Sequence, residues 1–168
     1  MKAMVINRVV SLRDQEAPLA AVELPVPEPE AGEIRIKVCA CGVCHTELDE
    51  IEGRTVPPRL PVVPGREVVG HVDKCGMGAA RFDIGERVGV GWIHSSTGTA
   101  EENLSPRFRA TGRDVNGCYA QYMTVPEVYA FPIPECFPIS TQRHCCAPAG
   151  SATAPSGSPG SWTARPGA

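Results

Sequence analysis

The chain has 168 residues, of which 42% are hydrophobic and 21% are charged, the size and balance of a single globular domain. Its net charge of −3 excludes a generally basic surface for nucleic acid, and no stretch supplies the roughly 20 apolar residues of a membrane-spanning helix. The first residues lead into no apolar block with a cleavage site, so we expect a cytoplasmic protein with neither nucleic acid nor membrane as a partner. Eight cysteines in such a protein favour metal, redox or core roles over disulfides.

Residues 1–139 carry the pattern of a β domain. Residues 33–38 alternate charged and apolar side chains, which is the period of a half-buried strand. Seventeen glycines and seventeen prolines favour turns, and the one helical turn predicted in the first half covers residues 44–52. The fold class is therefore mainly β with a few short helices. Further strands are predicted at residues 5–10, 22–26, 67–72, 87–92, 119–125 and 128–132.

The composition changes near residue 140. Between Ser140 and Ala168, 22 of 29 residues are Ala, Ser, Pro, Gly or Thr, and this segment holds no Leu, Ile, Val, Phe or Met. Such a segment cannot bury enough apolar surface to offset the entropy lost on ordering. We therefore expect residues 140–168 to form a disordered tail behind the β domain.

Three cysteines, Cys39, Cys41 and Cys44, follow the alternating segment. Thiolates at a strand end could converge on a metal ion, and a catalytic zinc typically takes three protein ligands. The same cysteines, with Cys75, could form a metal- or thiol-binding module, or Cys39 and Cys41 could be small buried side chains. A redox pair of Cys41 and Cys44 would need a βαβ context, which the β pattern does not offer.

Four motifs in this region resemble those of one family. They lie at residues 42–47, 60–70, 85–90 and 117–122 and read GVCHTE, LPVVPGREVVG, GERVGV and GCYAQY. In this order and spacing they resemble the N-terminal domain of zinc-dependent medium-chain alcohol dehydrogenases. The resemblance covers residues 1–139 and implies a GroES-like β-barrel, normally followed by a Rossmann domain that holds NAD(P).

The resemblance also implies a reaction, the zinc-assisted transfer of a hydride between a small alcohol or aldehyde and NAD(P). Cys44 stands at the first catalytic zinc ligand of the family, and Glu67 matches the glutamate beside the second ligand. His45 stands at a cofactor-phosphate or proton-relay position, and Thr46 at the relay hydroxyl. Glu47 replaces the aspartate that the family usually has behind the metal. Without the family, residues 45–47 would be interpreted as a solvated first helical turn.

Arg66 departs from this pattern, because it stands where the family places a histidine as the second zinc ligand. A guanidinium stays protonated and offers no lone pair, so it cannot coordinate zinc. We expect its side chain to point toward Cys44 and to pair with that thiolate or with Glu67. The catalytic zinc site is therefore expected to be degraded.

Other parts of the family pattern are missing as well. Thr97, Ala100 and Ser105 align with cysteines of the structural zinc lobe, so we expect no structural zinc and place His94 in a loop or at the surface. The chain has no Gly-x-Gly-x-x-Gly, so we expect the Rossmann domain to be absent. In a shifted reading frame the codons of residues 144–146 admit the family's third-ligand segment, and we hypothesise a frameshifted tail.

We therefore predict an alcohol-dehydrogenase-like oxidoreductase fragment that is inactive as this chain. Two alternatives stay open. One is the metal- or thiol-binding module of Cys39, Cys41 and Cys44, and the other is a non-functional, truncated gene product. Loss of the partner domain would expose apolar surface, through which we expect self-association.

Overall fold

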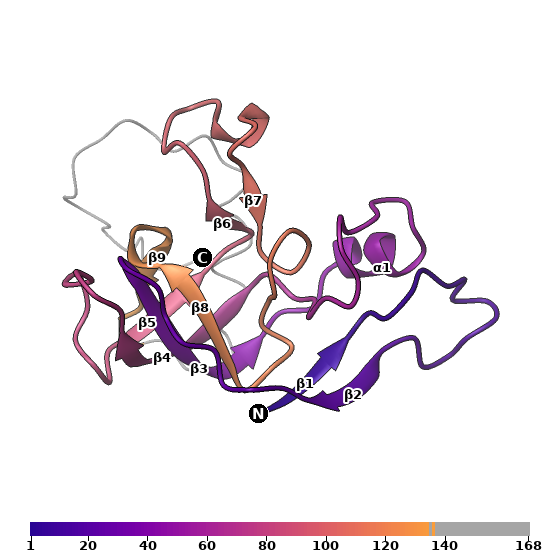
Figure 1. Ribbon diagram of the computed structural model, residues 1–168, viewed down its shortest axis with the longest axis horizontal. Coiled ribbons are helices and arrows are strands. Elements are labelled where there is room, and N and C mark those ends of the chain that lie inside the picture. The colour runs from indigo at the N-terminus through magenta and orange to yellow at the C-terminus, as the bar shows by residue number, and fades with distance from the viewer. Residues whose placement is uncertain (135, 137–168) are drawn as a thin grey trace, which may run out of the picture.

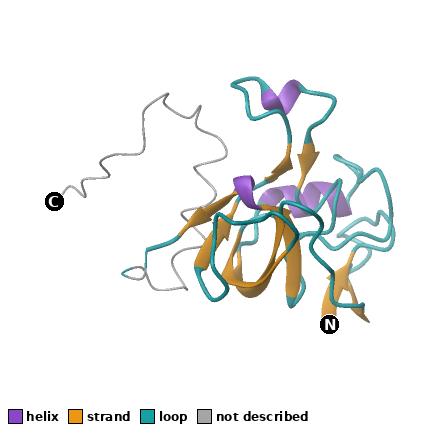
Figure 2. Cartoon of the chain, turned by 60° about the vertical axis from the view of Figure 1, so that its left-hand side comes forward, coloured by secondary structure: helices purple, strands orange, loops and turns teal. Residues whose placement is uncertain are grey.

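The computed structural model describes residues 1–134 and 136, and the predicted tail lies outside these residues. Its main element is a five-stranded antiparallel sheet in the order β8-β3-β4-β5-β9, which curls on itself (Figures 1 and 2). Two smaller pairs, β1-β2 and β6-β7, flank it. The strands are β1 Lys2–Val5, β2 Ala20–Glu23, β3 Glu33–Cys41, β4 Val68–Cys75, β5 Arg87–Val90, β6 Ile93–Ser95, β7 Arg109–Ala110, β8 Tyr122–Pro126 and β9 Ala130–Pro132. The helical segments are α1 His45–Ile51, η1 Glu102–Leu104 and η2 Glu127–Tyr129.

The predicted fold class, mainly β with a few short helices, is confirmed. The alternating segment forms β3, and its apolar residues Ile34 and Ile36 are fully buried inside the curl of the sheet. Val68 and Val72 from β4 and Val88 and Val90 from β5 belong to the same core. In the described part of the chain, every helical segment is too short and too polar to cross a bilayer.

All of the predicted strands differ in their bounds from the observed strands, and the cause is clear for two of them. The sequence predicts a strand over residues 5–10, but β1 ends at Val5. Ile6 forms a β-bridge with Val62 instead, and the chain then leaves the sheet. The strand predicted from residue 119 begins only at Tyr122, since Tyr119 and Ala120 cross over to bond β1. Both differences arise from contacts between segments that are far apart in the sequence.

The pairing of β3 with β4 brings the functional motifs together. Cys41, the last residue of β3, lies opposite Val68, the first residue of β4. Just beyond this pair, the N–H of Gly42 donates to the carbonyl of Glu67 at 2.7 Å. The segment that leads into α1 is therefore fixed against the segment that leads into β4.

Helix α1 confirms the helical turn predicted for residues 44–52. Cys44 is its extended N-cap residue, and the carboxylate of Glu47 accepts the N–H of Cys44 at 2.7 Å. The helix ends at Ile51, and Gly53 follows with a φ of 79°, a conformation that favours glycine. The carboxylate of Glu47 thus stabilises the start of the helix by accepting a hydrogen bond from the backbone of the N-cap residue.

A disulfide joins Cys41 to Cys118, so the expectation that the cysteines stay unpaired is wrong for these two. Their Cα atoms lie 6.3 Å apart although 77 residues separate them in the sequence. This Cα–Cα distance is compatible with a disulfide. The two cysteines come this close only in the folded chain. The bond ties the end of β3 to the segment before β8.

Hydrogen bonds around Glu102 hold the lobe formed by β6, η1 and β7. The carboxylate of Glu102 accepts the Tyr129 hydroxyl and the N–H of Gly98, each at 3.1 Å. Its carbonyl accepts the hydroxyl of Ser96 at 2.7 Å, and the Tyr129 hydroxyl accepts the N–H of Ser96 at 2.9 Å. The lobe is thereby tied to η2 beside the main sheet.

We expect Glu102→Ala to loosen this lobe selectively, because two donors lose their shared acceptor at a cost of about 1 kcal/mol. Limited proteolysis should then cut faster within residues 96–105, while the rest of the described chain keeps its protection. Glu101→Ala, which removes an exposed side chain next to Glu102, is the matched control. Equal cleavage of the two variants would contradict this assignment.

Candidate functional site

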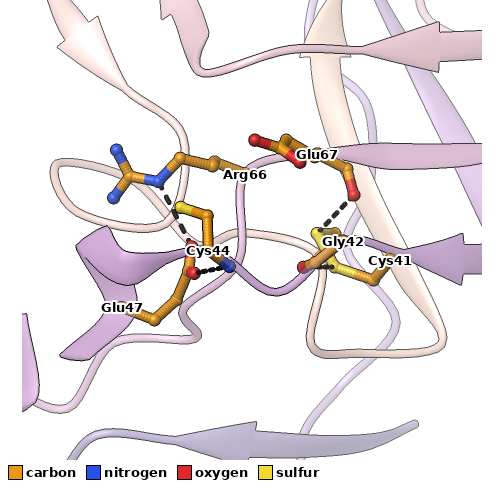
Figure 3. The surroundings of a disulfide bond; sticks show 7 residues. Cys41, Gly42, Cys44, Glu47, Arg66 and Glu67 are labelled. Carbon is orange, nitrogen blue, oxygen red and sulfur yellow. Dashed lines mark hydrogen bonds and ion pairs between the residues drawn. A yellow bond between two sulfur atoms is a disulfide. The ribbon is translucent and has the colours of Figure 1, made fainter. Parts of the chain in front are cut away.

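The candidate site lies where the β3–α1 connection meets the segment before β4 (Figure 3). Cys44, Glu47, Arg66 and Glu67 come together there, as the figure shows. The side chains of Cys44 and Glu67 are half-buried, whereas those of Glu47 and Arg66 are buried. Of the other predicted residues, Thr46 is half-buried and His45 is exposed on the first turn of α1.

Arg66 is a buried cation with two carboxylate partners from α1. Only 8% of the residue is exposed, and Glu47 and Glu50 are 3% and 0% exposed. The Arg66 Nε donates to Glu47 Oε1 at 3.3 Å, and one terminal nitrogen donates to Glu50 Oε1. We call Arg66, Glu47 and Glu50 the ion cluster.

These partners differ from the expected pairing of Arg66 with Cys44 or Glu67. The carboxylates of Glu47 and Glu50 are three residues apart, so they share one face of α1 and both reach the guanidinium. Glu50 was missed from the sequence. The spacing of Glu50 from Glu47 could have revealed it, because two acidic residues three positions apart in a helix lie on the same face.

The ion cluster holds two carboxylates and a single cation. Burial, with a smaller contribution from the charge of Glu47, raises the pKa of Glu50 to about 7 against the attraction of Arg66. The second oxygen of Glu50, Oε2, is buried and has no hydrogen-bond partner in the described part of the chain. Protonation of Glu50 would relieve this excess of negative charge.

Tyr119 also borders the site. Its ring lies against Gly65, where an added Cβ would stand 2.4 Å from the ring, and Gly65 also has a φ of 93°. Burial raises the pKa of the Tyr119 hydroxyl, and the charges of Glu47, Cys44 and Glu67 raise it further. Gly65 therefore cannot be replaced without moving the ring that borders the site.

Glu67 lies against the glycine before the N-cap. A Cβ on Gly42 would stand 2.6 Å from the Glu67 carboxylate, so the absence of a side chain there makes room for Glu67. Glu67 and Cys44 thus both lie at the short connection into α1 (Figure 3). The structure brings these two predicted residues into one site.

The three clustered cysteines have three different environments. The Sγ of Cys39 lies 3.3 Å from His71, Cys41 is bonded to Cys118, and Cys44 caps α1. Across residues 1–134 and 136, no group of three or more His, Cys, Asp or Glu side chains could hold a metal ion. In the described residues, Cys39, Cys41 and Cys44 therefore do not converge on one metal ion.

His94 lies in a strand with its side chain 12% exposed, so the expectation of a loop or surface residue is wrong. It belongs to β6, where its ring is 4.0 Å from the carboxylate of Glu33. Burial lowers the pKa of His94, and Glu33 acts in the opposite direction. The nearby residues Thr97, Ala100 and Ser105 belong to the lobe that Glu102 organises.

Comparison with known proteins gives a family for this fold and this set of motifs. A family model described as the alcohol dehydrogenase GroES-like domain matches residues 30–135. The probable alcohol dehydrogenase AdhA of Mycobacterium tuberculosis is 42% identical over 128 residues, which are 70% of this chain and 37% of that protein. An alcohol dehydrogenase of Geobacillus stearothermophilus is 37% identical over 142 residues, which are 80% of this chain and 40% of that protein.

Solved structures agree with this assignment. A crystal structure of an NAD-dependent alcohol dehydrogenase has a TM-score of 0.74 at 30% identity, over 83% of this chain and 41% of that one. A putative zinc-binding dehydrogenase from Sinorhizobium meliloti 1021, bound to NADP, has a TM-score of 0.74 at 28% identity, over 86% and 41% of the two chains. The chain spans less than half the length of each of these relatives. The expected GroES-like fold is confirmed, and the chain belongs to the alcohol dehydrogenase family through this domain.

Proposed function

We propose that this chain is an alcohol-dehydrogenase-type oxidoreductase domain that has lost the family's zinc-assisted hydride transfer at its metal site. The observation that carries the proposal is the buried guanidinium of Arg66, held by Glu47 and Glu50 beside Cys44 and Glu67. By resemblance, Cys44 and Glu67 are the remaining metal-site residues, and His45 and Thr46 are the remaining relay residues.

The donor set argues against a tightly held zinc ion. In the family, zinc acts as a Lewis acid that stabilises the alkoxide of the substrate. A catalytic zinc site usually has three protein ligands, whereas by resemblance Cys44 alone of the three remains, with Glu67 next to the position of the second ligand. Arg66 offers no lone pair, and its fixed positive charge repels a second cation. The residues present therefore do not fit the metal.

The balance of charges also argues against zinc binding at this site. The ion cluster already gives Glu47 a cationic partner, and Glu47 is the carboxylate that stands behind the metal in the family pattern. A zinc ion entering beside Cys44 would have to displace this buried ion pair or accept the repulsion of Arg66. Both routes cost free energy, and zinc binding at a site with one remaining family ligand does not recover that cost.

Metal binding tests this proposal independently of turnover. We expect isothermal titration to show no tight binding of zinc by the full chain, and Co²⁺ to give no thiolate-to-cobalt absorption band. Arg66→His should bind zinc weakly, because it restores one ligand and leaves the third missing. Ethanol and benzyl alcohol should give no turnover with NAD or NADP in either protein.

Tight zinc binding by the unaltered chain would overturn the proposal, and mapping by Cys44→Ser would then locate the site. Loss of binding in Cys44→Ser would place the ion at the family's position in spite of Arg66. Loss in Cys39→Ser as well would favour the cysteine module instead.

The ion cluster leads to a prediction about stability. We expect Arg66→Met to lower the free energy of unfolding by about 3 kcal/mol, because it leaves two buried carboxylates without a cation. The triple variant Arg66→Met, Glu47→Gln, Glu50→Gln removes the charges together and should recover most of that loss. Urea unfolding followed by circular dichroism measures both. A mild effect of Arg66→Met, with no recovery in the triple variant, would show that the cluster contributes little.

Glu50 leads to a prediction about pH. Its pKa rises from the usual 4.5 to about 7 on folding, so the folded state binds a proton more tightly than the unfolded state does. The contribution of Glu50 to the free energy of unfolding should therefore be fully present below about pH 4.5. It should fall by up to about 3 kcal/mol as the pH rises through 7.

Urea unfolding at pH 5 and pH 8 tests this sign. Glu50→Gln should flatten the fall, because glutamine does not titrate, whereas Glu28→Gln, at an exposed carboxylate, should leave it in place. A fall that persists unchanged in Glu50→Gln would assign it to other groups.

A further inference from the structure

Cys39 occupies an unusual position in β3. Val38 pairs with Gly70 and Ala40 pairs with Val69, so Cys39 is the extra residue of a β-bulge and faces no residue of β4. Its thiol is free and the residue is exposed. The bulge therefore presents a thiol to solvent in the middle of a paired strand.

The thiol has a base beside it. The Sγ of Cys39 lies 3.3 Å from Nδ1 of the half-buried His71 on β4. With the ring proton on Nε2, Nδ1 is an acceptor and can take the thiol proton. Because the thiolate is the nucleophilic form, this pair has the geometry of an activated thiol.

The surrounding face of the sheet is cationic. His71 lies directly opposite Lys37 on β3 and opposite Arg87 on β5, and cross-strand partners share one face of a sheet. Asp73, two residues further along β4, is already paired with Arg35 at 2.6 Å. The charges on this face favour an anionic reaction partner.

We propose that Cys39 and His71 form a site of thiol–disulfide exchange with small anionic disulfides. His71 accepts the proton of the Cys39 thiol, and the thiolate attacks one sulfur of the disulfide. A new S–S bond forms between Cys39 and that sulfur, while the original S–S bond breaks and its electron pair leaves on the second sulfur as a thiolate. The leaving thiolate can take the proton from His71, so the exchange needs no further reactant.

This site is separate from the proposed loss of zinc chemistry. It uses neither Cys44 nor the ion cluster, and it lies on the outer face of the sheet, whereas Cys41 packs against the core. Failure of one proposal therefore leaves the other unaffected.

The experiment measures the rate at which 5,5′-dithiobis(2-nitrobenzoate), a doubly anionic disulfide, labels individual cysteines of the full chain. Peptide mapping by mass spectrometry separates the sites, and the exposed Cys136 is the internal control. We expect Cys39 to react at least roughly tenfold faster than Cys136, and His71→Gln to abolish that advantage. In urea, which separates the two strands, the rates of Cys39 and Cys136 should become similar without any substitution.

A second arm tests the preference for anions. Lys37→Gln should slow the reaction of Cys39 with the anionic disulfide more than its reaction with neutral 2,2′-dithiodipyridine. An equal effect on both reagents would overturn the anionic preference. A Cys39 that reacts no faster than Cys136 in the folded chain, or that keeps its advantage in urea, would overturn the site itself.

Discussion

The site depends on one constraint, which is that the buried guanidinium of Arg66 needs anionic partners. Arginine cannot give up its charge in a protein, so a buried Arg66 requires carboxylates within hydrogen-bond reach. Helix α1 supplies them from Glu47 and Glu50, one turn apart on the same face. The short helix is thereby fixed to the segment before β4 by ionic contacts as well as by the Gly42–Glu67 backbone bond.

The ion cluster does not balance its charges. One guanidinium faces two carboxylates, and Glu50 keeps a buried oxygen without a hydrogen-bond partner among the described residues. Burial of the Glu50 carboxylate and the charge of Glu47 both favour a bound proton, which explains the raised pKa of Glu50. A divalent metal ion would bring twice the charge of Arg66. Under the proposed loss of the metal site, Arg66 would replace a mobile double charge with a fixed single one.

The sequence was sufficient for local features and for chemistry that depends on residue type alone. Alternation predicted β3, acidic residues before Gly53 predicted α1, and the missing lone pair of Arg66 argued against a metal ligand. Partners across the fold could not be predicted. Glu50 meets Arg66 only because of the phase of α1, and Cys41 meets Cys118 only because the sheet brings together segments 77 residues apart.

The bulge at Cys39 explains why neighbouring cysteines have different environments. In a regular strand, residues two apart share a face, so Cys39 and Cys41 would lie on the same side of the sheet. Val38 and Cys41 both pack against the core, three positions apart, which a regular strand does not allow. The extra residue at Cys39 shifts the phase of the strand by one. It turns Cys41 inward toward Cys118 and leaves Cys39 outside beside His71, so one backbone irregularity separates a structural disulfide from an exposed thiol.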